Sequence, residues 1–414
     1  MHLKIPFGEC GEQELLIPEE NLLGVAGPQQ LPQVDSLSVL RRALRAPRGA
    51  EKIESFIASC RNLLVLVNDA TRPTPTSMVL EELAPLFDPG RVSFMVATGT
   101  HRAPGEEELG RIFGRFRDEF RGRIFLHDAR RAEMVKIGVS RNGTEIILNR
   151  RAVEADGLLV ISSVEPHYFA GYTGGRKSFL PGVAAFSTIE QNHRQALLPQ
   201  ARILQLEGNP IHQDMVDAVT FLNKPVFDIE MVLDSRHRIY AATAGDIFQA
   251  FEEAVRMAQE VFCVSVPRPA DIVVSVVRYP ADIDFYQAHK GIENVKQALA
   301  SGGIIILVAE CRSGIGERAF YDLLGSAPDP RAVFEKIAAG YRLGYHKAAK
   351  LAEALLAGQI FAVTSLERAL LQKIFFKTFD TVQQALQRAL EIKGKDAGVL
   401  VVMDSSLCVP RVVK

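Results

Sequence analysis

The sequence predicts an α/β protein made of two α/β domains with mostly parallel sheets. Short apolar runs rich in β-branched residues recur along the chain, and amphipathic helical stretches separate them. Such runs are typical of strands buried on both faces of a parallel sheet, and strand–helix alternation builds these sheets through right-handed crossovers. The chain has 414 residues, enough for two or three domains at about 150 residues each.

The elements can be assigned in chain order. The apolar runs predicted as buried strands are residues 62–67, 92–97, 123–127, 157–164, 271–277 and 303–309. The stretches between them that have helical periodicity include residues 76–87, 105–120, 252–261 and 292–300.

Three further segments define the organisation. Residues 226–245 hold two apolar runs around Asp234–His237, which predicts a β-hairpin at a sheet edge. The prolines of residues 264–271 precede a new strand and mark the domain boundary. We therefore expect domains at 1–266 and 267–414, and the strand at 398–403 could belong to either.

Composition excludes several classes of protein. Lys+Arg (48) and Asp+Glu (49) nearly balance, which argues against a nucleic-acid coat or a polybasic membrane binder. No apolar run approaches the ~18 residues that span a bilayer, and the N-terminus lacks the pattern of a secretory signal. The five cysteines form no C-x-x-C pair, so we expect reduced thiols, no zinc site and a cytoplasmic location.

Unusual polar clusters follow four of the predicted strands. Ligands of open parallel sheets bind beyond the carboxyl ends of the strands, so these loops are the candidate site. The clusters are NDATRPTPT (68–76), TGTHRAPGE (98–106), EPHYFAGYTGGRKSFLPG (165–182) and RYPADIDFYQAHKGIEN (278–294).

The first two loops supply acid–base and anion-binding candidates. Arg72 precedes a proline and is held extended, so its fork suits a carboxylate or phosphate. Asp69 lies too far from the helix expected at Thr76 to be a comfortable N-cap, although a capping role stays open. His101 follows Gly99 at a strand end, where acid–base use competes with a structural role.

The third loop combines glycines with cations and predicts a phosphate cradle. Its spacing lacks the second glycine of a P-loop, which excludes an NTPase of that type. A lysine held in such a loop could also be a covalent anchor, because a desolvated amine is nucleophilic. The residues concerned are Gly171, Gly174, Gly175, Gly182, His167, Arg176 and Lys177.

Two helices and a glycine pair complete the candidates. Residues 186–198 predict a helix with Ser187 or Thr188 as N-cap, and His193 on it could be a core residue or a metal ligand. Tyr286, Gln287 and Lys290 open another helix, where Tyr286 and Lys290 share a face suited to a small anion. Gly314 and Gly316 fit a short dinucleotide pattern that is a weak predictor alone.

Together these motifs resemble the nickel-dependent lactate racemase family. The resemblance rests on DATRPTPT, ATGTHR, EPHYFAGYTGGRKSFLPGVA, TIEQNH and DFYQAHKGIENV, in this order, and runs from about residue 5 to past residue 320. It implies two α/β domains with the active site in the cleft between them. It also implies a nickel-pincer nucleotide cofactor, which depends on cofactor-biosynthesis enzymes for its supply.

The resemblance implies a role for each candidate. Reversible hydride transfer between the cofactor and a small 2-hydroxy acid would invert the substrate, with a base on each side. The implied roles are acid–base for His101 and His167, covalent attachment for Lys177, nickel ligation for His193, cofactor binding for Gly174, Gly175 and Arg176, substrate binding for Arg72, Tyr286, Gln287 and Lys290, and support for Asp69.

Two alternatives from other classes stay open at this point. A nicotinamide-dependent dehydrogenase would use Gly314 and Gly316 and would turn over NAD(H). A non-catalytic carrier of nickel or cofactor would not need two histidines at strand ends. The sequence does not identify the 2-hydroxy acid, and it does not show which histidine transfers the proton of which enantiomer.

Overall fold

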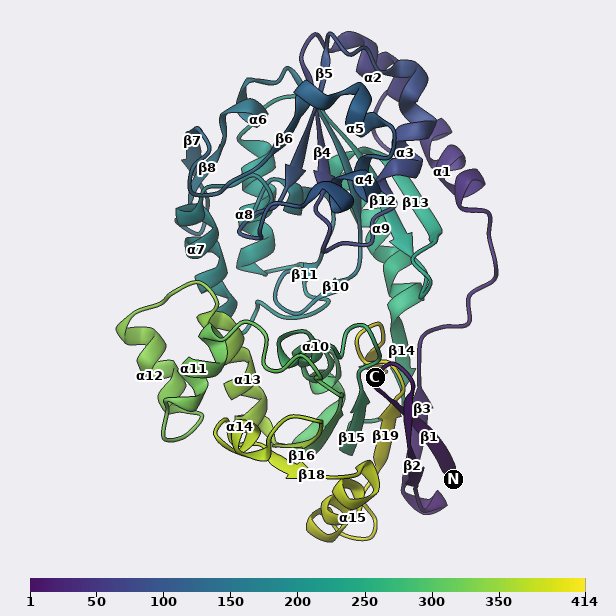
Figure 1. Ribbon diagram of the computed structural model, residues 1–414, viewed down its shortest axis with the longest axis vertical. Helices are drawn as coiled ribbons and strands as arrows, with labels where there is room; N and C mark the ends of the chain where they lie inside the picture. Colours follow the sequence, from purple (N-terminus) through teal and green to yellow (C-terminus); the bar gives the residue numbers. More distant parts are fainter. Residues whose placement is uncertain (414) are drawn as a thin grey trace. The chain divides into compact units, whose positions relative to one another are not determined.

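The computed structural model describes residues 1–413 and divides into two compact units (Figure 1). One unit comprises residues 31–261, and the other combines residues 1–30 with the chain from residue 262 onward. Each is an α/β unit around a six-stranded sheet, which confirms the predicted fold class. Among residues 1–413 no helix has the length and apolar composition that crossing a bilayer requires.

The sheet of the unit 31–261 has the order β13-β12-β9-β4-β5-β6, and only β13 runs antiparallel to its neighbour. Every residue of β9 is buried, as expected for a central strand covered on both faces. The strands are β4 (Leu63–Asn68), β5 (Val92–Ala97), β6 (Ile124–Leu126), β9 (Gly157–Ser163), β12 (Val226–Leu233) and β13 (Ile239–Asp246).

Helices and two small hairpins surround this sheet (Figure 1). The helices are α1 (Ser36–Arg45), α2 (Ile53–Ser59), α3 (Thr76–Leu83), α4 (Glu106–Phe113), α5 (Phe116–Glu119), α6 (Arg150–Glu154), α7 (Phe186–Arg194), α8 (Pro210–Thr220) and α9 (Ile247–Phe262). The hairpins are β7 (Met134–Val139) with β8 (Glu145–Asn149), and β10 (Pro166–His167) with β11 (Gly171–Tyr172).

The strand order places a topological switch point between β4 and β9. The chain runs from β4 outward through β5 and β6, then returns to the other side of β4 with β9 and β12. Loops leaving the carboxyl ends of strands on either side of such a point separate and leave room for a ligand. The loops after β4 and β9 are two of the four polar clusters of the sequence.

The other unit holds an all-parallel sheet of order β18-β17-β16-β15-β19-β3. Its own switch point lies between β15 and β19, and the fourth polar cluster follows β15. The strands are β3 (Leu22–Ala26), β15 (Ala270–Val276), β16 (Leu299–Val308), β17 (Gln359–Val363), β18 (Lys377–Phe379) and β19 (Val399–Val402).

This unit also contains the N-terminal hairpin, a short parallel pair and six helices. The paired strands are β1 (His2–Phe7) with β2 (Gly11–Leu16), and β14 (Cys263–Val266) with β20 (Val409–Val412). The helices among the described residues are α10 (Phe285–Val295), α11 (Ala319–Gly325), α12 (Ala332–Ala339), α13 (Tyr345–Ala357), α14 (Arg368–Gln372) and α15 (Val382–Lys393).

We expected domains at 1–266 and 267–414, but the first 30 residues belong to the C-terminal unit. They pack with the C-terminal part of the chain, because β3 pairs with β19 at the edge of that sheet. The strand predicted at 398–403 is β19 and belongs to the same sheet. A pairing between strands about 375 residues apart has no local signal in the sequence.

The predicted strands all occur, and the hairpin at 226–245 is β12–β13 with β13 at the edge. Two helix predictions are wrong in detail. The helix expected at 292–300 begins at Phe285, and β16 already starts at Leu299. The N-cap of α7 is Ala185 instead of Ser187 or Thr188, and the Thr188 hydroxyl instead donates to the carbonyl of Glu145 at 2.6 Å.

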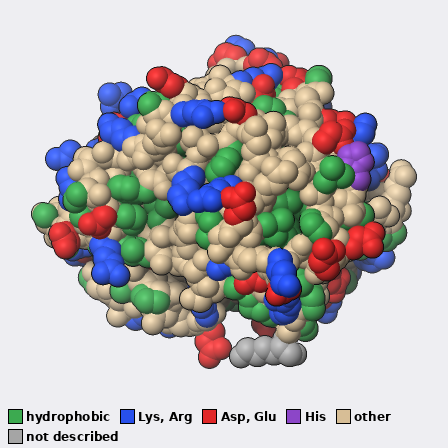
Figure 2. Space-filling model, turned by 90° about the horizontal axis from the view of Figure 1, so that it is seen from below, with side chains coloured by type: hydrophobic (Ala, Val, Ile, Leu, Met, Phe, Trp, Pro, Cys, Tyr) green, Lys and Arg blue, Asp and Glu red, His purple; other side chains and the backbone are tan. Residues whose placement is uncertain are grey.

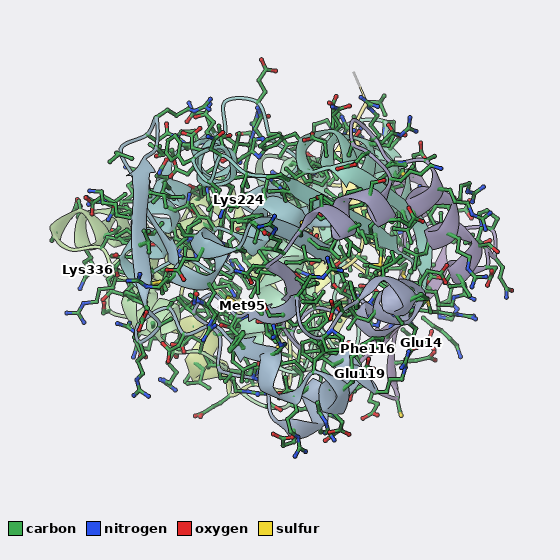
Figure 3. The ribbon with its side chains drawn as sticks, turned by 90° about the horizontal axis from the view of Figure 1, so that it is seen from above. Glu14, Met95, Phe116, Glu119, Lys224 and Lys336 are labelled. Carbon is green, nitrogen blue, oxygen red and sulfur yellow. The ribbon has the colours of Figure 1, made fainter. Side chains whose placement is uncertain are left out.

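Side chains of the two sheets form separate apolar cores. Rings of Phe94, Phe116 and Phe120 pack beside β5, with Phe116 stacked 6.1 Å from Phe120. Phe116 is labelled in Figure 3. Figure 3 also labels Lys224, and the ammonium of Lys224 donates to the carbonyl of Ala155, at the end of α6, at 2.6 Å. On the face shown in Figure 2, basic and acidic groups are interspersed, in keeping with the near-zero net charge.

Candidate active site

Hydrogen bonds tie the loops after β4, β5 and β9 into one assembly. The hydroxyls of Thr74 and Ser163 lie 2.9 Å apart and join the first loop to the end of β9. The amide of Gly99 donates to the carbonyl of Gly182 at 2.9 Å, and the amide of Gly182 donates to that of Lys177 at 2.9 Å. The sequence-predicted groups of this unit are therefore held at one edge of the sheet.

Asp69 contacts His101 directly. Asp69 Oδ2 lies 2.7 Å from His101 Nδ1, and the amide and hydroxyl of Thr71 donate to Asp69 Oδ1 at 2.9 and 2.6 Å. Burial opposes ionisation of Asp69, but the hydrogen bond and charge of His101, with the Thr71 bonds, hold the pKa of Asp69 below its usual value. Asp69 does not cap α3, whose N-cap is Pro75.

This contact orients the imidazole of His101. An ionised carboxylate only accepts, so Nδ1 of His101 carries the proton, and the neutral ring has its lone pair on Nε2. The carboxyl of Asp69 is buried, whereas the side chain of His101 is 54% exposed. His101 is therefore held by its inner nitrogen, and its outer nitrogen can act as a base.

His167 lies in the β10–β11 hairpin, beyond β9. The amide of Ala170 donates to His167 Nδ1 at 3.3 Å. Since an amide only donates, the neutral ring carries its proton on Nε2, the opposite arrangement to His101. The rings of Tyr168 and Phe169 pack against the imidazole, with centroids 5.0 and 4.5 Å away.

Lys177 follows β9 in the 3₁₀ turn Gly175–Ser178. Burial, together with the positive charges of Arg72 and Arg176, holds the pKa of Lys177 well below its ordinary value, although Glu165 opposes this. Its Nζ lies 5.7 Å from the centroid of the Phe169 ring. Lowering the pKa of a lysine raises its share of neutral amine, which is the nucleophilic form.

Arg72 pairs with a carboxylate that the sequence analysis did not single out. Its Nη1 donates to Glu165, the first residue of the EPHYF motif, and both side chains are about three-quarters buried, with 28% and 22% exposed. The contact fixes the guanidinium beside Lys177 and uses one of its nitrogens. Glu165 stands directly after a buried strand, the same positional signal that identified its neighbours.

His193 lies in the last turn of α7, which a buried aspartate anchors. Asp214 of α8 accepts from Asn192 at 3.1 Å and from Gln195 at 2.5 Å, the residues on either side of His193 along the helix. The ring of Phe169 lies 5.1 Å from that of His193. Phe169 thus contacts three predicted site residues, His167, Lys177 and His193.

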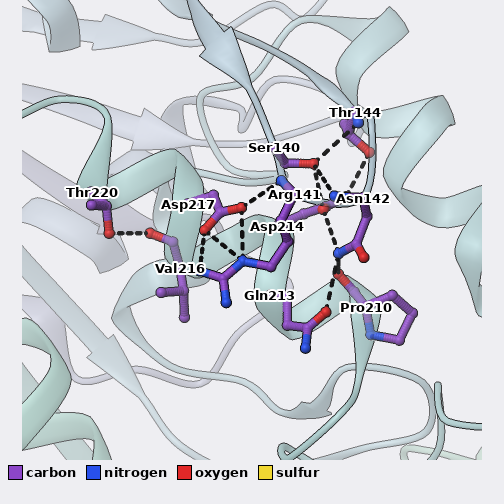
Figure 4. A network of polar contacts seen from close by, with 10 residues as sticks. All are labelled: Ser140, Arg141, Asn142, Thr144, Pro210, Gln213, Asp214, Val216, Asp217 and Thr220. Carbon is purple, nitrogen blue, oxygen red and sulfur yellow. Dashed lines mark hydrogen bonds and ion pairs between the residues drawn. The ribbon is translucent and has the colours of Figure 1, made fainter.

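The same aspartate connects α8 to the β7–β8 hairpin (Figure 4). The hydroxyls of Ser140 and Thr144 donate to Asp214 at 2.7 and 2.6 Å. Beside it Arg141 forms an ion pair with Asp217, with Nη2 and Oδ1 2.5 Å apart. Through Asp214 this network connects the end of α7 to α8 and to the β7–β8 hairpin, so groups that the sequence did not reveal support the position of His193.

Arg176 points into the protein and is 1% exposed. Its Nε donates to His212 Nδ1 at 2.7 Å, and its Nη atoms donate to the carbonyls of Thr173 at 2.7 Å and Tyr172 at 2.9 Å. Burial lowers the pKa of Arg176 to about 9 and that of His212 to about 3, so His212 is a neutral acceptor. The nitrogens of Arg176 thus stabilise the loop that carries Lys177. Contact between Arg176 and a cofactor stays a prediction.

A buried carboxyl pair lies beneath the loop. Asp228 and Glu230 of β12 are both 0% exposed, and Glu230 accepts from the Gly175 amide and the Ser162 hydroxyl at 2.5 Å each. Burial raises the pKa of both carboxyls, and the charge of Glu230 raises that of Asp228 further. We interpret the pair as holding one proton, which leaves one negative charge to balance Arg176.

Glycine is required where the loop crosses this pair. A Cβ on Gly174, whose φ is +116°, would lie 2.6 Å from Glu230 Oε1. A Cβ on Gly175 would lie 2.4 Å from Asp228 Oδ2. The glycines thus let the backbone approach the carboxyls, and their predicted cofactor contact is untested.

Tyr286, Gln287 and Lys290 open α10 in the other unit, with Asp284 as N-cap accepting from the Gln287 amide at 2.8 Å. Tyr286 and Lys290 are half-buried and Gln287 is exposed. The amide of Tyr286 donates to the carbonyl of Ile315 at 3.0 Å.

The glycine pair of the dinucleotide pattern has a local use in this unit. The carbonyl of Gly314 accepts from the Phe285 amide at 3.0 Å, and Gly316, with φ +76°, packs where a Cβ would lie 2.8 Å from Tyr286 Cβ. Both glycines therefore build a turn that supports the start of α10.

No group of three or more His, Cys, Asp or Glu side chains in residues 1–413 is arranged to hold a metal ion. Fold and site together define an α/β protein with two histidines, a buried lysine and an arginine in the loops beyond the strand ends of one sheet.

Comparisons with known proteins define the family. The sequence model "Lactate racemase N-terminal domain" matches residues 8–203, and "Lactate racemase C-terminal domain" matches residues 266–409. The chain is 32% identical to a lactate racemase from Thermoanaerobacterium thermosaccharolyticum, with 97% of each chain covered. It is also 32% identical to one from Lactiplantibacillus plantarum, with 94% of this chain and 95% of the relative covered.

Solved structures agree. The lactate racemase apoprotein from T. thermosaccharolyticum superposes with a TM-score of 0.90 at 31% identity, over 99% of this chain and 100% of the other. A Thermotoga maritima protein at 16% identity shares the fold, with a TM-score of 0.66 over 91% and 99% of the two chains. The chain belongs to the lactate racemase family, and as a racemase it falls in the isomerase class.

Proposed function

We propose that this enzyme racemises lactate or a related small 2-hydroxy acid, with a nickel-pincer nucleotide bound to Lys177 and His193. The observation that carries the proposal is the grouping of a buried lysine, whose pKa is lowered, with two histidines that carry their protons on opposite nitrogens, beyond β5 and β9 on either side of β4. The relatives are named lactate racemases, which supports lactate as the first substrate to test.

The residues present fit such a cofactor. A covalent anchor requires a neutral amine, and burial beside Arg72 and Arg176 favours that form of Lys177 by lowering its pKa. His193 offers one imidazole from a rigid helix, which suits a metal whose other ligands belong to the cofactor. Both lie near the Phe169 ring. When bound, the cofactor would supply a reversible hydride acceptor.

The protein's own part is proton transfer and positioning. Nε2 of His101 would accept the hydroxyl proton of one enantiomer, while Nε2–H of His167 would donate a proton to the oxygen of the planar 2-keto acid from the other side. The roles reverse in the opposite direction. Two groups are needed because the enantiomers place their hydroxyls on opposite sides of the reacting carbon.

Arg72 would bind the substrate carboxylate with the nitrogens that Glu165 leaves available. Tyr286, Gln287 and Lys290 would contribute further substrate contacts. Holding the carboxylate while the rest of the substrate turns would present either face to the hydride acceptor.

The test is chiral analysis of D- and L-lactate, with other 2-hydroxy acids, incubated with protein coproduced with cofactor-biosynthesis enzymes. We expect each lactate enantiomer to give the racemate without added NAD⁺. Protein produced alone should be inactive. Keto acid formation that depends on NAD⁺, without inversion, would support a dehydrogenase instead.

A further inference from the structure

A lysine from α13 is buried beneath the first turn of α10. Lys347 is 7% exposed, and its Nζ donates to the carbonyl of Tyr286 at 2.7 Å. The same ammonium stands over the Tyr286 ring, 3.1 Å from the centroid, and 5.6 Å from that of Phe320. One cation therefore contacts both the backbone and the ring of Tyr286, by a charge-assisted hydrogen bond and a cation–π interaction.

The surroundings of Lys347 balance its charge only in part. Burial lowers the pKa of Lys347 to about 7; Asp284 opposes this shift and Lys290 adds to it. Burial lowers the pKa of the neighbouring His289 and His346, and the charge of Lys347 lowers both further. The titratable and charged groups that interact with it are Asp284, Tyr286, His289, Lys290 and Glu293 at the start of and along α10, His346 on α13, and Glu317 in the loop before α11.

We propose that Lys347 is a positioning residue for substrate binding, whose charged ammonium holds the first turn of α10 and adds positive potential beside Lys290. The inference rests on the proposed function, because it assumes that Tyr286 and Lys290 contact the substrate. Loss of the proton removes the attraction to the Tyr286 ring and one positive charge. Substrate affinity should therefore fall as the pH rises through 7.

The test compares the KM for lactate between pH 6 and 8.5 in holoenzyme with Lys347, Lys347→Met and Lys347→Arg. With Lys347 we expect KM to rise about tenfold across neutral pH, the effect of one charge-assisted contact. Lys347→Met should have the high KM at every pH, and Lys347→Arg, which stays charged, should keep the low KM. The kcat should change less than KM in both variants, since Lys347 is not assigned a proton-transfer role.

The matched control is Lys350→Met, one turn along α13. Lys350 is 2% exposed and lies 3.2 Å from Glu353, and it makes no hydrogen bond to Tyr286. This variant should retain the pH step in KM. If Lys347→Arg does not fold, the ¹³Cε shift of Lys347 in labelled wild-type protein, assigned with Lys347→Met, provides a second measurement and should titrate near pH 7.

The outcomes separate the two claims. If the Lys347→Met enzyme is active and its KM has the wild-type value and pH dependence, the role of Lys347 is overturned. The proposed function then stays intact. A Lys347 resonance that titrates above pH 9.5 would also overturn it. Wild-type holoenzyme that inverts no 2-hydroxy acid would overturn the proposed function, and the positioning role with it.

Discussion

Asp69 Oδ2 lies 2.7 Å from His101 Nδ1, so a buried carboxylate holds the inner nitrogen of a histidine whose side chain is 54% exposed. The contact joins the loop after β4 to the loop after β5 on one side of the switch point. It determines which nitrogen of His101 can receive a proton.

Asp69→Asn should impair His101 without removing it. The variant keeps the shape of the side chain but removes the negative charge that stabilises an imidazolium formed when His101 accepts a proton. An amide can also donate to Nδ1 and favour the other tautomer, so we expect a rate loss of about tenfold or more. Asp88→Asn, at an exposed turn, is the control. An unchanged kcat/KM would contradict this role of Asp69.

Lys177→Ala should abolish covalent attachment of the cofactor. Intact mass spectrometry of protein coproduced with the biosynthesis enzymes should show one mononucleotide-sized adduct, absent in the variant and in protein produced alone. Lys136→Ala, on the exposed β7–β8 hairpin, should keep the adduct. Peptide mapping that placed the adduct on another lysine would refute the assignment.

His193→Ala should lose nickel and keep its fold. The side chain lies at the end of a helix held by Asp214, so the cost in stability should be about 1–2 kcal/mol at most. Elemental analysis of the purified holoprotein measures the metal, and circular dichroism checks the fold. His237→Ala, in the β12–β13 turn, is the matched control. Retention of one nickel per chain would return α7 to a purely structural role.

The Asp228–Glu230 pair predicts an asymmetric double-mutant result. Asp228→Asn replaces the carboxyl that we interpret as protonated. The free energy of unfolding should therefore change by less than about 1 kcal/mol. Adding Glu230→Gln leaves Arg176 without a countercharge and should cost about 3–5 kcal/mol. Denaturant unfolding of the single and double variants measures both. Equal losses for the two single variants and simple additivity would contradict the shared proton.

The sequence predicted the sheets well because their strands carry local signals. Residues 157–164, for example, are apolar, β-branched and followed by a polar loop, and they form the central strand β9. Placing Asp69, His101, His167 and Lys177 at one edge of the sheet needed only the rule that parallel strands end on the same side.

The sequence analysis missed the buried groups that support the site residues through hydrogen bonds. Asp214 lies on an ordinary amphipathic helix, and nothing local reveals that it anchors the helix of His193. Asp228 and Glu230 did leave a signal, since two acids alternate with apolar residues in VFDIEMVL. Such alternation is usually read as a solvent-facing side of an edge strand, but β12 is covered on both faces. The inward direction of Arg176 likewise depends on distant residues.

The central claim, that His101 and His167 handle the protons of opposite enantiomers, is tested most directly by single-turnover oxidation of each pure enantiomer. Holoenzyme in excess over lactate is quenched with acid, and pyruvate is trapped as its hydrazone. One enantiomer should give pyruvate with His167→Ala but ~10²–10⁴-fold more slowly with His101→Ala, and the other enantiomer should invert this pattern. Pyruvate formation at wild-type rates from both enantiomers in both variants would contradict the two-histidine mechanism.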